Sequence, residues 1–509
     1  MWLLLLLVII LFVAIVAIIG GEYWSLYGKN EIRRFGAVVG MFRNCSRMFR
    51  IWLGPFSVLC TNHPEVIRQI LSNPDCMEKP FFYRFTGLES GLLSAEHHVW
   101  RSQRKLLNST FNLKILNSFI PIFETCCKKM IQNINQLENG STINILNYAS
   151  KCTLEMVCGT TIGMDDGSTI NILNYASKCT LEMVCGTTIG MDVLESNNKE
   201  VMLGYIQRLF NLVSKRMLNV HLYFDWIYCF TRNYWEERML RSVCMQTADQ
   251  LIIEKRRFIS GSTNLNKNMT NNMYLEIQPK IPKIFIEQLL EDSFSSRKFT
   301  SKEIYHNAYT IILAGNDTSA LSVAYACLFL AMYPHIQDRI HAEIQHFLPS
   351  EDTPITPENL KQLEYMDMFV KETLRHCPAI PVIARKAIKN VSIDNQVIPK
   401  NSIIIMSLYT LHRRKDIWGP NATNFDPENF HPDRIKLRDQ YAYLPFSGGP
   451  RNCIGWRYAL MNIKVMLVYL VRNFSLRTDI KQTDLRFRFD LTLKLAFEHR
   501  IQLEKRRVD

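Results

Sequence analysis

The stretch "FSGGPRNCIG", residues 446–455, places one cysteine, Cys453, among three glycines and an arginine. The chain has 14 cysteines, so this one could be a packed thiol, half of a disulfide or a metal ligand. Glycines permit a tight loop in which backbone amides point at the sulfur. Such amides stabilise a thiolate and tune the metal that it binds. The loop therefore favours a ligand, and haem iron is one metal that a cysteine thiolate holds.

Three neighbours of Cys453 fit this interpretation. Arg451 supplies a cation for a haem carboxylate or for the thiolate itself. Gly455, which follows the cysteine closely, allows a helix to start near the face of the porphyrin. Phe446 can pack against the ring side of the loop.

The N-terminus argues against the disulfide. Residues 1–19 carry no charged side chain, and about twenty apolar residues span a bilayer as a helix. We therefore expect a transmembrane anchor at 1–20 and a linker at 21–40. Basic residues follow the apolar run, which predicts a cytosolic body whose thiols stay reduced. A cleaved signal peptide, the alternative, would show a basic start and a small-residue cleavage site.

Composition excludes little. The 509 residues are 47% apolar and 21% charged, with a formal net charge of +13. These are the values of an ordinary globular protein that can bury a sizeable core. The charge allows nucleic acid, a membrane surface or an acidic protein as a partner. We see no nucleic-acid-binding motif and expect no such partner, whereas the N-terminus supports a membrane.

The pattern of the remaining chain is mostly helical. Residues 300–334 predict a long buried helix that Thr300 or Ser301 can cap, and 357–376 predict another. Alternating residues then predict strands with a turn at Asp394–Asn395. No linker clearly divides this part of the chain. The sequence therefore predicts one large, mainly α (α+β) domain at 41–509.

A perfect repeat interrupts this pattern. The segment "GSTINILNYASKCTLEMVCGTTIGMD" occurs at 140–165 and again, identically, at 167–192. Solenoid repeats diverge and need three or more units, so residues 140–192 hold a tandem duplication and not an architecture. One copy should fill a helix position in the fold. The other should loop out or extend the surface, and the sequence does not say which copy does so.

The cysteine loop carries a family resemblance. "FSGGPRNCIG" matches the F-x-x-G-x-R-x-C-x-G signature of the haem-thiolate monooxygenases, so the chain resembles the cytochrome P450 enzymes over roughly residues 40–505. The resemblance implies the single large cytochrome P450 fold with small β-sheets, with Cys453 as the axial ligand of the iron in haem b. "KETLRHCPAIPVIAR", "LHRRKDIW" and "FDPENF" look most like the animal family 4 branch.

A second motif, "AGNDTS", lies at 314–319 inside the long predicted helix. Ala314, Asp317 and Thr318 share one helical face, and Gly315 thins the helix where a ligand could approach. The segment resembles the family's oxygen-activation motif, which implies that Asp317 and Thr318 deliver protons. Read alone, an Asp-Thr pair in a helix is more often a local hydrogen bond. Some family 4 members carry a glutamate that esterifies the haem at the position of Ala314, so we predict non-covalent haem here.

A third motif, "ETLR", places Glu372 and Arg375 one helical turn apart. Other Glu-x-x-Arg pairs in the chain, such as Glu65–Arg68, indicate only exposed helix pairs. The resemblance implies that 372–375 is the buried pair that supports the haem pocket. The arginine that usually completes this triad is replaced by Asn429 in "FDPENF".

Two further segments resemble haem-carboxylate sites. In "WRSQR", Trp100 and Arg104 share one helical face, and in the family they reach a haem propionate. Arg385 in "PVIAR" resembles another propionate-binding position. Arg101 and Lys105 face outward and could dock an acidic electron donor, although a solvated basic face is about equally probable from sequence.

The resemblance implies a microsomal monooxygenase. It would sit in the endoplasmic reticulum membrane, take electrons from NADPH through a cytochrome P450 reductase, possibly with cytochrome b5, and insert one atom of O2 into a lipophilic substrate such as a fatty acid, hydrocarbon, hormone-like lipid or xenobiotic. Two alternatives stay open: a reductase-independent haem-thiolate isomerase and a non-catalytic haem or lipid binder. We expect the pocket walls at 79–98, 205–226, Ile311 to Ala314, 379–384 and 491–496.

Overall fold

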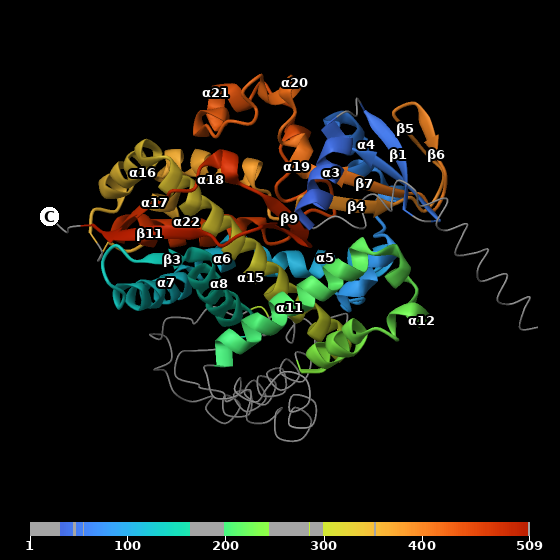
Figure 1. Ribbon diagram of the computed structural model, residues 1–509, viewed down its shortest axis with the longest axis horizontal. Helices are drawn as coiled ribbons and strands as arrows, with labels where there is room; N and C mark the ends of the chain where they lie inside the picture. Colours follow the sequence, from blue (N-terminus) through green and yellow to red (C-terminus); the bar gives the residue numbers. More distant parts are fainter. Residues whose placement is uncertain are drawn as a thin grey trace, which may run out of the picture.

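The computed structural model describes residues 31–43, 47–53, 55–162, 198–243, 285, 299–350 and 353–506. It is mainly helical with small sheets, as the sequence predicts (Figure 1). The expected anchor at 1–20 lies outside the described residues. Part of the expected linker at 21–40 belongs to the domain instead, because helix α3 (Glu31–Arg43) buries Phe35 and Phe42.

Helix α15 (Ser301–Met332) runs through the centre of the molecule (Figure 1). Thr300 caps it in a reciprocal capping box with Glu303, which satisfies two backbone amides at its start. In the described part of the chain it is the one helix long and apolar enough to cross a membrane. It packs instead against α8 (Ile145–Ile162), α18 (Glu364–His376) and α22 (Trp456–Asn473), so its apolar faces are explained by burial.

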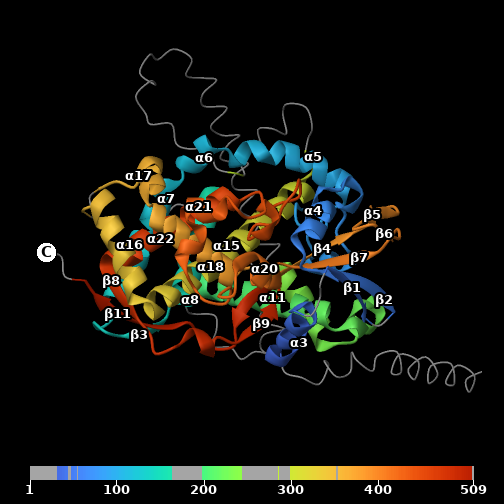
Figure 2. The ribbon, with the colours of Figure 1, turned by 90° about the horizontal axis from the view of Figure 1, so that it is seen from above.

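The other helices form layers on both sides of α15 (Figure 2). The predicted helix at 357–376 is in fact two, because Leu363 leaves the helical region with ψ at 71°. The longer helices around α15 are α4 (Pro64–Ser72), α5 (His97–Leu107), α7 (Ile120–Asn135), α11 (Asn198–Leu218), α16 (Pro334–Phe347) and α17 (Pro357–Gln362).

Four small sheets complete the fold. The largest has the order β1 (Met48–Leu53), β2 (Phe56–Thr61), β7 (Ile403–Ser407), β4 (Val382–Lys386), and only its β2–β7 pairing is parallel. The predicted turn at Asp394–Asn395 joins β5 (Val391–Ile393) to β6 (Gln396–Ile398), with both turn residues at positive φ. The other two sheets are β9 (Phe487–Asp490) with β10 (Thr492–Leu495), and β3 (Thr142–Asn144) with β11 (Arg500–Lys505) and β8 (Phe474–Arg477).

The first copy of the duplication is part of this fold. It supplies β3, which pairs with β11, and helix α8, which packs along α15. Gly315 allows this close packing, since a Cβ there would lie 3.0 Å from Val157 Cγ2. Beside it, Thr153 Oγ1 donates a 2.8 Å hydrogen bond to Asn316 Oδ1. The second copy, 167–192, lies outside the described residues.

Deleting residues 166–192 should leave the fold intact. The deletion restores one copy and shortens the connection between α8 and α11, residues 163–197, without removing any β3 or α8 contact. Two halvings of a loop return roughly 1 kcal/mol of closure entropy, so thermal unfolding should show equal or slightly higher stability. A clear loss of stability would mean that the second copy makes contacts that the first does not. Deleting 140–166 gives the same chain, which makes the result independent of the copy removed.

Candidate functional site

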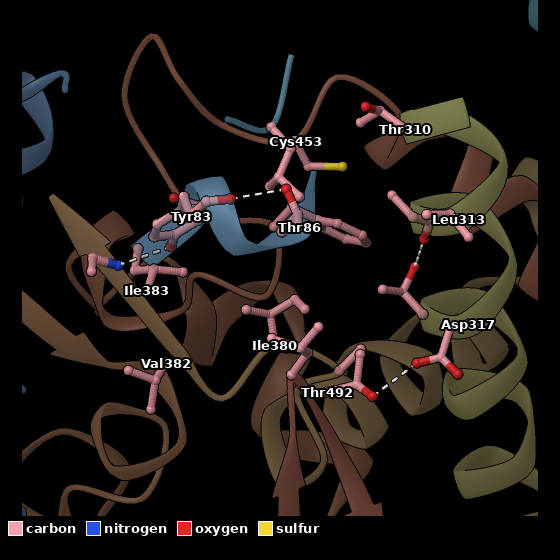
Figure 3. Close-up of a pocket in the computed structure, with 18 of the residues that line it drawn as sticks. Tyr83, Thr86, Thr310, Leu313, Asp317, Ile380, Val382, Ile383, Cys453 and Thr492 are labelled. Carbon is pink, nitrogen blue, oxygen red and sulfur yellow. Dashed lines mark hydrogen bonds between the residues drawn. The ribbon is translucent and has the colours of Figure 1, made fainter. Parts of the chain in front are cut away.

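A cavity of about 1690 Å³ lies beneath α15 (Figure 3). The cysteine loop forms one wall, α15 faces it, and α5 and β4 close the sides. Every wall segment that the sequence predicts contributes lining residues. The lining also includes α3 and β1 residues and Val157, Thr160 and Thr161 of α8, which the sequence does not point to because their contacts come from distant parts of the chain.

The loop before α22 holds Cys453 in place. The Cys453 backbone N–H donates to the Phe446 carbonyl at 3.0 Å and closes the loop across "FSGGPRNC". Gly449 has φ at +69°, and a Cβ there would lie 2.2 Å from the Leu71 carbonyl oxygen, so glycine is required. The Cys453 Sγ therefore points into the cavity toward the α15 side (Figure 3). Gly455 differs, because a Cβ there would make only an ordinary contact with Phe111 at 3.7 Å.

The electrostatics of Cys453 suit a metal ligand. It is a free thiol whose accessible surface lies in the cavity. Burial raises its pKa, while the Gly455 backbone amide and the Arg104 guanidinium act in the opposite direction. A thiol held neutral by burial becomes a stable thiolate only when a cation bonds to it directly. Haem iron would provide that cation, with Phe446 beside it in the cavity wall.

The α15 motif faces the same cavity. Ala314, Gly315, Asp317 and Thr318 all line it. The Thr318 hydroxyl donates to the Ala314 carbonyl at 2.6 Å, which is the local hydrogen bond that the sequence leaves open. Asp317 is not paired with Thr318, because its Oδ2 accepts from Thr492 Oγ1 at 2.8 Å (Figure 3).

A second contact fixes the carboxylate of Asp317. The Lys494 Nζ lies 3.7 Å from Asp317 Oδ1 and 3.6 Å from Asp490 Oδ2. The β9–β10 hairpin thus orients this carboxylate at the edge of the cavity. Sequence reasoning missed Thr492 and Lys494, since nothing local to that hairpin indicates a partner on α15.

Three of the predicted haem-contacting residues are cations gathered around the cysteine loop. Arg104 donates to the Asn452 carbonyl at 2.7 Å and to its Oδ1 at 2.9 Å. Arg451 donates to the Met77 carbonyl at 2.8 Å and stands over the ring of buried Trp100 at 5.1 Å. Arg385 reaches the Arg451 carbonyl at 3.4 Å.

These cations lack counter-charges. Within the described residues none of the three forms an ion pair with a carboxylate, and the Nε atoms of Arg385 and Arg451 have no hydrogen-bond partner. Burial lowers the pKa of Arg104 and Arg385, and with the charge of Arg385 it lowers the pKa of Arg451 to about 10. Buried charges are normally paired, so the cluster fits an anionic ligand such as the two carboxylates of haem.

The Glu372–Arg375 pair supports the site from behind. Both side chains are fully buried, and two hydrogen bonds of 2.7 Å join them. Burial raises the pKa of Glu372, but the hydrogen bonds from Arg375 and His376 outweigh it and hold that pKa at about 2. Arg375 also donates to the carbonyls of His412 and Ala422. His412 Nε2 in turn accepts from the backbone N–H of Leu444, just before the cysteine loop.

Asn429 occupies the place of the expected third charge. Its Nδ2 donates to Glu372 Oε1 at 3.2 Å, so the amide replaces a guanidinium in the network. A cation arrives from elsewhere: Arg438 donates to the Asn429 carbonyl and lies over the Trp418 ring at 4.5 Å. The charge of Glu372 raises the pKa of Arg438 against the lowering effects of burial and Arg375. The substitution by Asn429 therefore leaves the network satisfied.

The predicted outward pair behaves as its helical positions require. Arg101 and Lys105 are exposed on α5, one step around the helix from buried Trp100.

Comparisons with known proteins agree with this geometry. The family model described as "Cytochrome P450" matches residues 27–168 and 164–497. "Probable cytochrome P450 313a4" of Drosophila melanogaster is 29% identical over 96% of this chain and 92% of its own length. "Cytochrome P450 4c21" of Blattella germanica is 29% identical over 84% and 80%, and the human "Cytochrome P450 4V2" is 25% identical over 91% and 83%.

Proposed function

The chain belongs to the cytochrome P450 family, and from that membership we propose a microsomal haem-thiolate monooxygenase that draws electrons from NADPH through a reductase. One observation carries the proposal: Cys453 Sγ points into an apolar cavity whose opposite wall holds Asp317 and Thr318. A haem site without oxygen chemistry would have no use for a hydroxyl and a carboxylate at that wall.

Each residue has a defined task in this proposal. Haem, when bound, supplies the oxygen-activating chemistry. Cys453 holds the iron through Sγ, and Arg104, Arg385 and Arg451 hold the carboxylates. Thr318 keeps its hydroxyl hydrogen on the Ala314 carbonyl, so its oxygen can accept a hydrogen bond from the cavity side. Asp317, oriented by Thr492, can take a proton from the hairpin side and pass it toward Thr318.

The cavity favours a lipophilic substrate. Its walls are dominated by aliphatic and aromatic side chains, which bind apolar groups by excluding water. Ile380, Val382 and Ile383 project from β4 and the turn before it (Figure 3). Together with the family 4 relatives, this supports a long-chain lipid or fatty acid as substrate.

A membrane location has separate support. Residues 1–20 supply the proposed anchor in the endoplasmic reticulum, with the catalytic domain cytosolic. Near α12 (Asp225–Tyr228), Trp226, Phe230 and Trp235 are exposed, and Trp52 of β1 is exposed as well. Exposed aromatic residues of this kind insert at the interface of a bilayer. Exposed Arg101 and Lys105 would dock the acidic face of the reductase or of cytochrome b5.

A reconstitution experiment tests the proposal. The full chain should remain with carbonate-washed membranes and, with purified reductase, consume NADPH in step with product formed from a long-chain fatty acid. Thr318→Ala should still consume NADPH but form about tenfold less product, since proton delivery contributes 10²–10⁴-fold to such steps. Ser350→Ala, at an exposed site, is the matched control. Haem loading without NADPH consumption would favour the isomerase or the non-catalytic binder.

A further inference from the structure

Lys79 is a fourth cation at the cavity, and no motif in the sequence marks it. It lines the cavity just after the β-bridge between Glu78 and Lys386. Its Nζ stands over the ring of Tyr83 at 4.4 Å. Tyr83 is itself fixed, because its hydroxyl accepts from the backbone N–H of Ala384 at 3.3 Å.

Lys79 lies beside the arginine cluster. Arg451 binds the carbonyl of Met77, two residues earlier, and Arg385 follows Ala384 on β4. Burial and the charges of Arg385 and Arg451 lower the pKa of Lys79 well below its ordinary value. Among the described residues no carboxylate forms an ion pair with it, and its neighbour Glu78 instead accepts from the backbone N–H of His97 at 2.8 Å.

This arrangement costs stability when the cavity holds no anion. A lysine next to two guanidinium groups is repelled by both, and desolvation adds to the cost. Such a residue persists when a ligand supplies the missing negative charge. Tyr83 contributes a cation–π contact that keeps the ammonium directed along the cavity wall.

We propose that Lys79 binds a carboxylate inside the cavity. Two ligands of the proposed function carry that chemistry, the propionates of haem and the head group of a fatty acid. The proximity of Arg385 and Arg451 favours the propionate. The inference rests on the proposed haem site, and its test reads ligand affinity and apo-protein stability instead of turnover.

The first measurement is haem loss from the purified full chain to excess apomyoglobin. Lys79→Met should release haem about tenfold faster than wild type, in line with the loss of one charge-assisted hydrogen bond, and Lys79→Arg should restore retention. With haem dimethyl ester, wild type and Lys79→Met should release at equal rates. Lys389→Met, which removes an exposed cation near Asp75, should not differ from wild type. Complete transfer would also agree with the non-covalent haem that Ala314 predicts.

A second measurement separates a ligand-binding role from a structural one. Because Lys79 is unfavourable without its anion, the apo-protein of Lys79→Met should unfold at the same temperature as wild type or higher. A structural lysine would lower that temperature.

Three results distinguish the outcomes. Faster loss of ordinary haem alone assigns the propionate. Unchanged haem loss with at least tenfold weaker binding of dodecanoic acid, but not of dodecan-1-ol, assigns the substrate carboxylate. If neither ligand is affected, or if the apo-protein is destabilised, the proposal is wrong. Wild-type protein that retains no haem at all would instead overturn the proposed function.

Discussion

Cys453→Ser should abolish the spectrum of thiolate-ligated haem. Reduced wild-type protein with carbon monoxide should show the strongly red-shifted Soret band of a cysteine thiolate, and the variant should not. The reason is chemical: a serine hydroxyl at the cavity floor does not ionise under these conditions and gives no electron density to the iron. Monooxygenase activity should fall below detection with it.

The variant should nevertheless fold. Cys453 contributes its backbone N–H, not its side chain, to loop closure with Phe446, and serine keeps that hydrogen bond. Cys229→Ser is the matched control, because Cys229 is a free, partly exposed thiol outside the cavity lining. It should retain the full band. An unshifted, histidine-like band from wild-type protein would contradict the assignment of Cys453 as the ligand.

Arg375→Met should cost about 3–5 kcal/mol of folding stability, which is the usual effect of leaving a buried charge without its partner. The change strands the carboxylate of Glu372 and frees the carbonyls of His412 and Ala422. Chemical denaturation monitored by circular dichroism measures the loss. Since His412 orients the backbone before the cysteine loop, haem content should fall as well.

The chain provides a close control for this experiment. Glu65 and Arg68 have the same spacing and the same two-point geometry, with hydrogen bonds of 2.9 and 2.7 Å, but lie on the exposed side of α4. Arg68→Met should therefore leave denaturation almost unchanged. Equal effects of the two variants would contradict a supporting role for the buried pair.

The same pair predicts how stability depends on pH. The pKa of Glu372 is about 2 in the folded state against an ordinary 4.5. Its contribution is therefore complete above pH 4.5 and is lost as the pH falls toward 2. Arg375→Met should flatten this part of the acid-unfolding curve relative to wild type.

The sequence predicted the site well where the signal was local. The cysteine loop is a short run whose glycines and backbone hydrogen bond lie within ten residues, and Cys453 takes the predicted place. The α15 motif faces the cavity because helical periodicity fixes which residues share a face. The boundaries were less accurate: helix 357–376 is broken at Leu363, and α3 begins inside the expected linker.

The sequence alone determined the family, the identity of the ligand cysteine and the helical core, because each depends on residue types at short fixed spacings. Only the tertiary structure decided which charges meet. Lys79, Arg385 and Arg451 surround one end of the cavity from segments far apart in the chain. Arg438 supplies the cation that Asn429 lacks, and the first copy of the duplication fills the α8 position. The physical reason is the same in each case: long-range electrostatic and packing contacts form only when the chain is folded, and no local pattern records them.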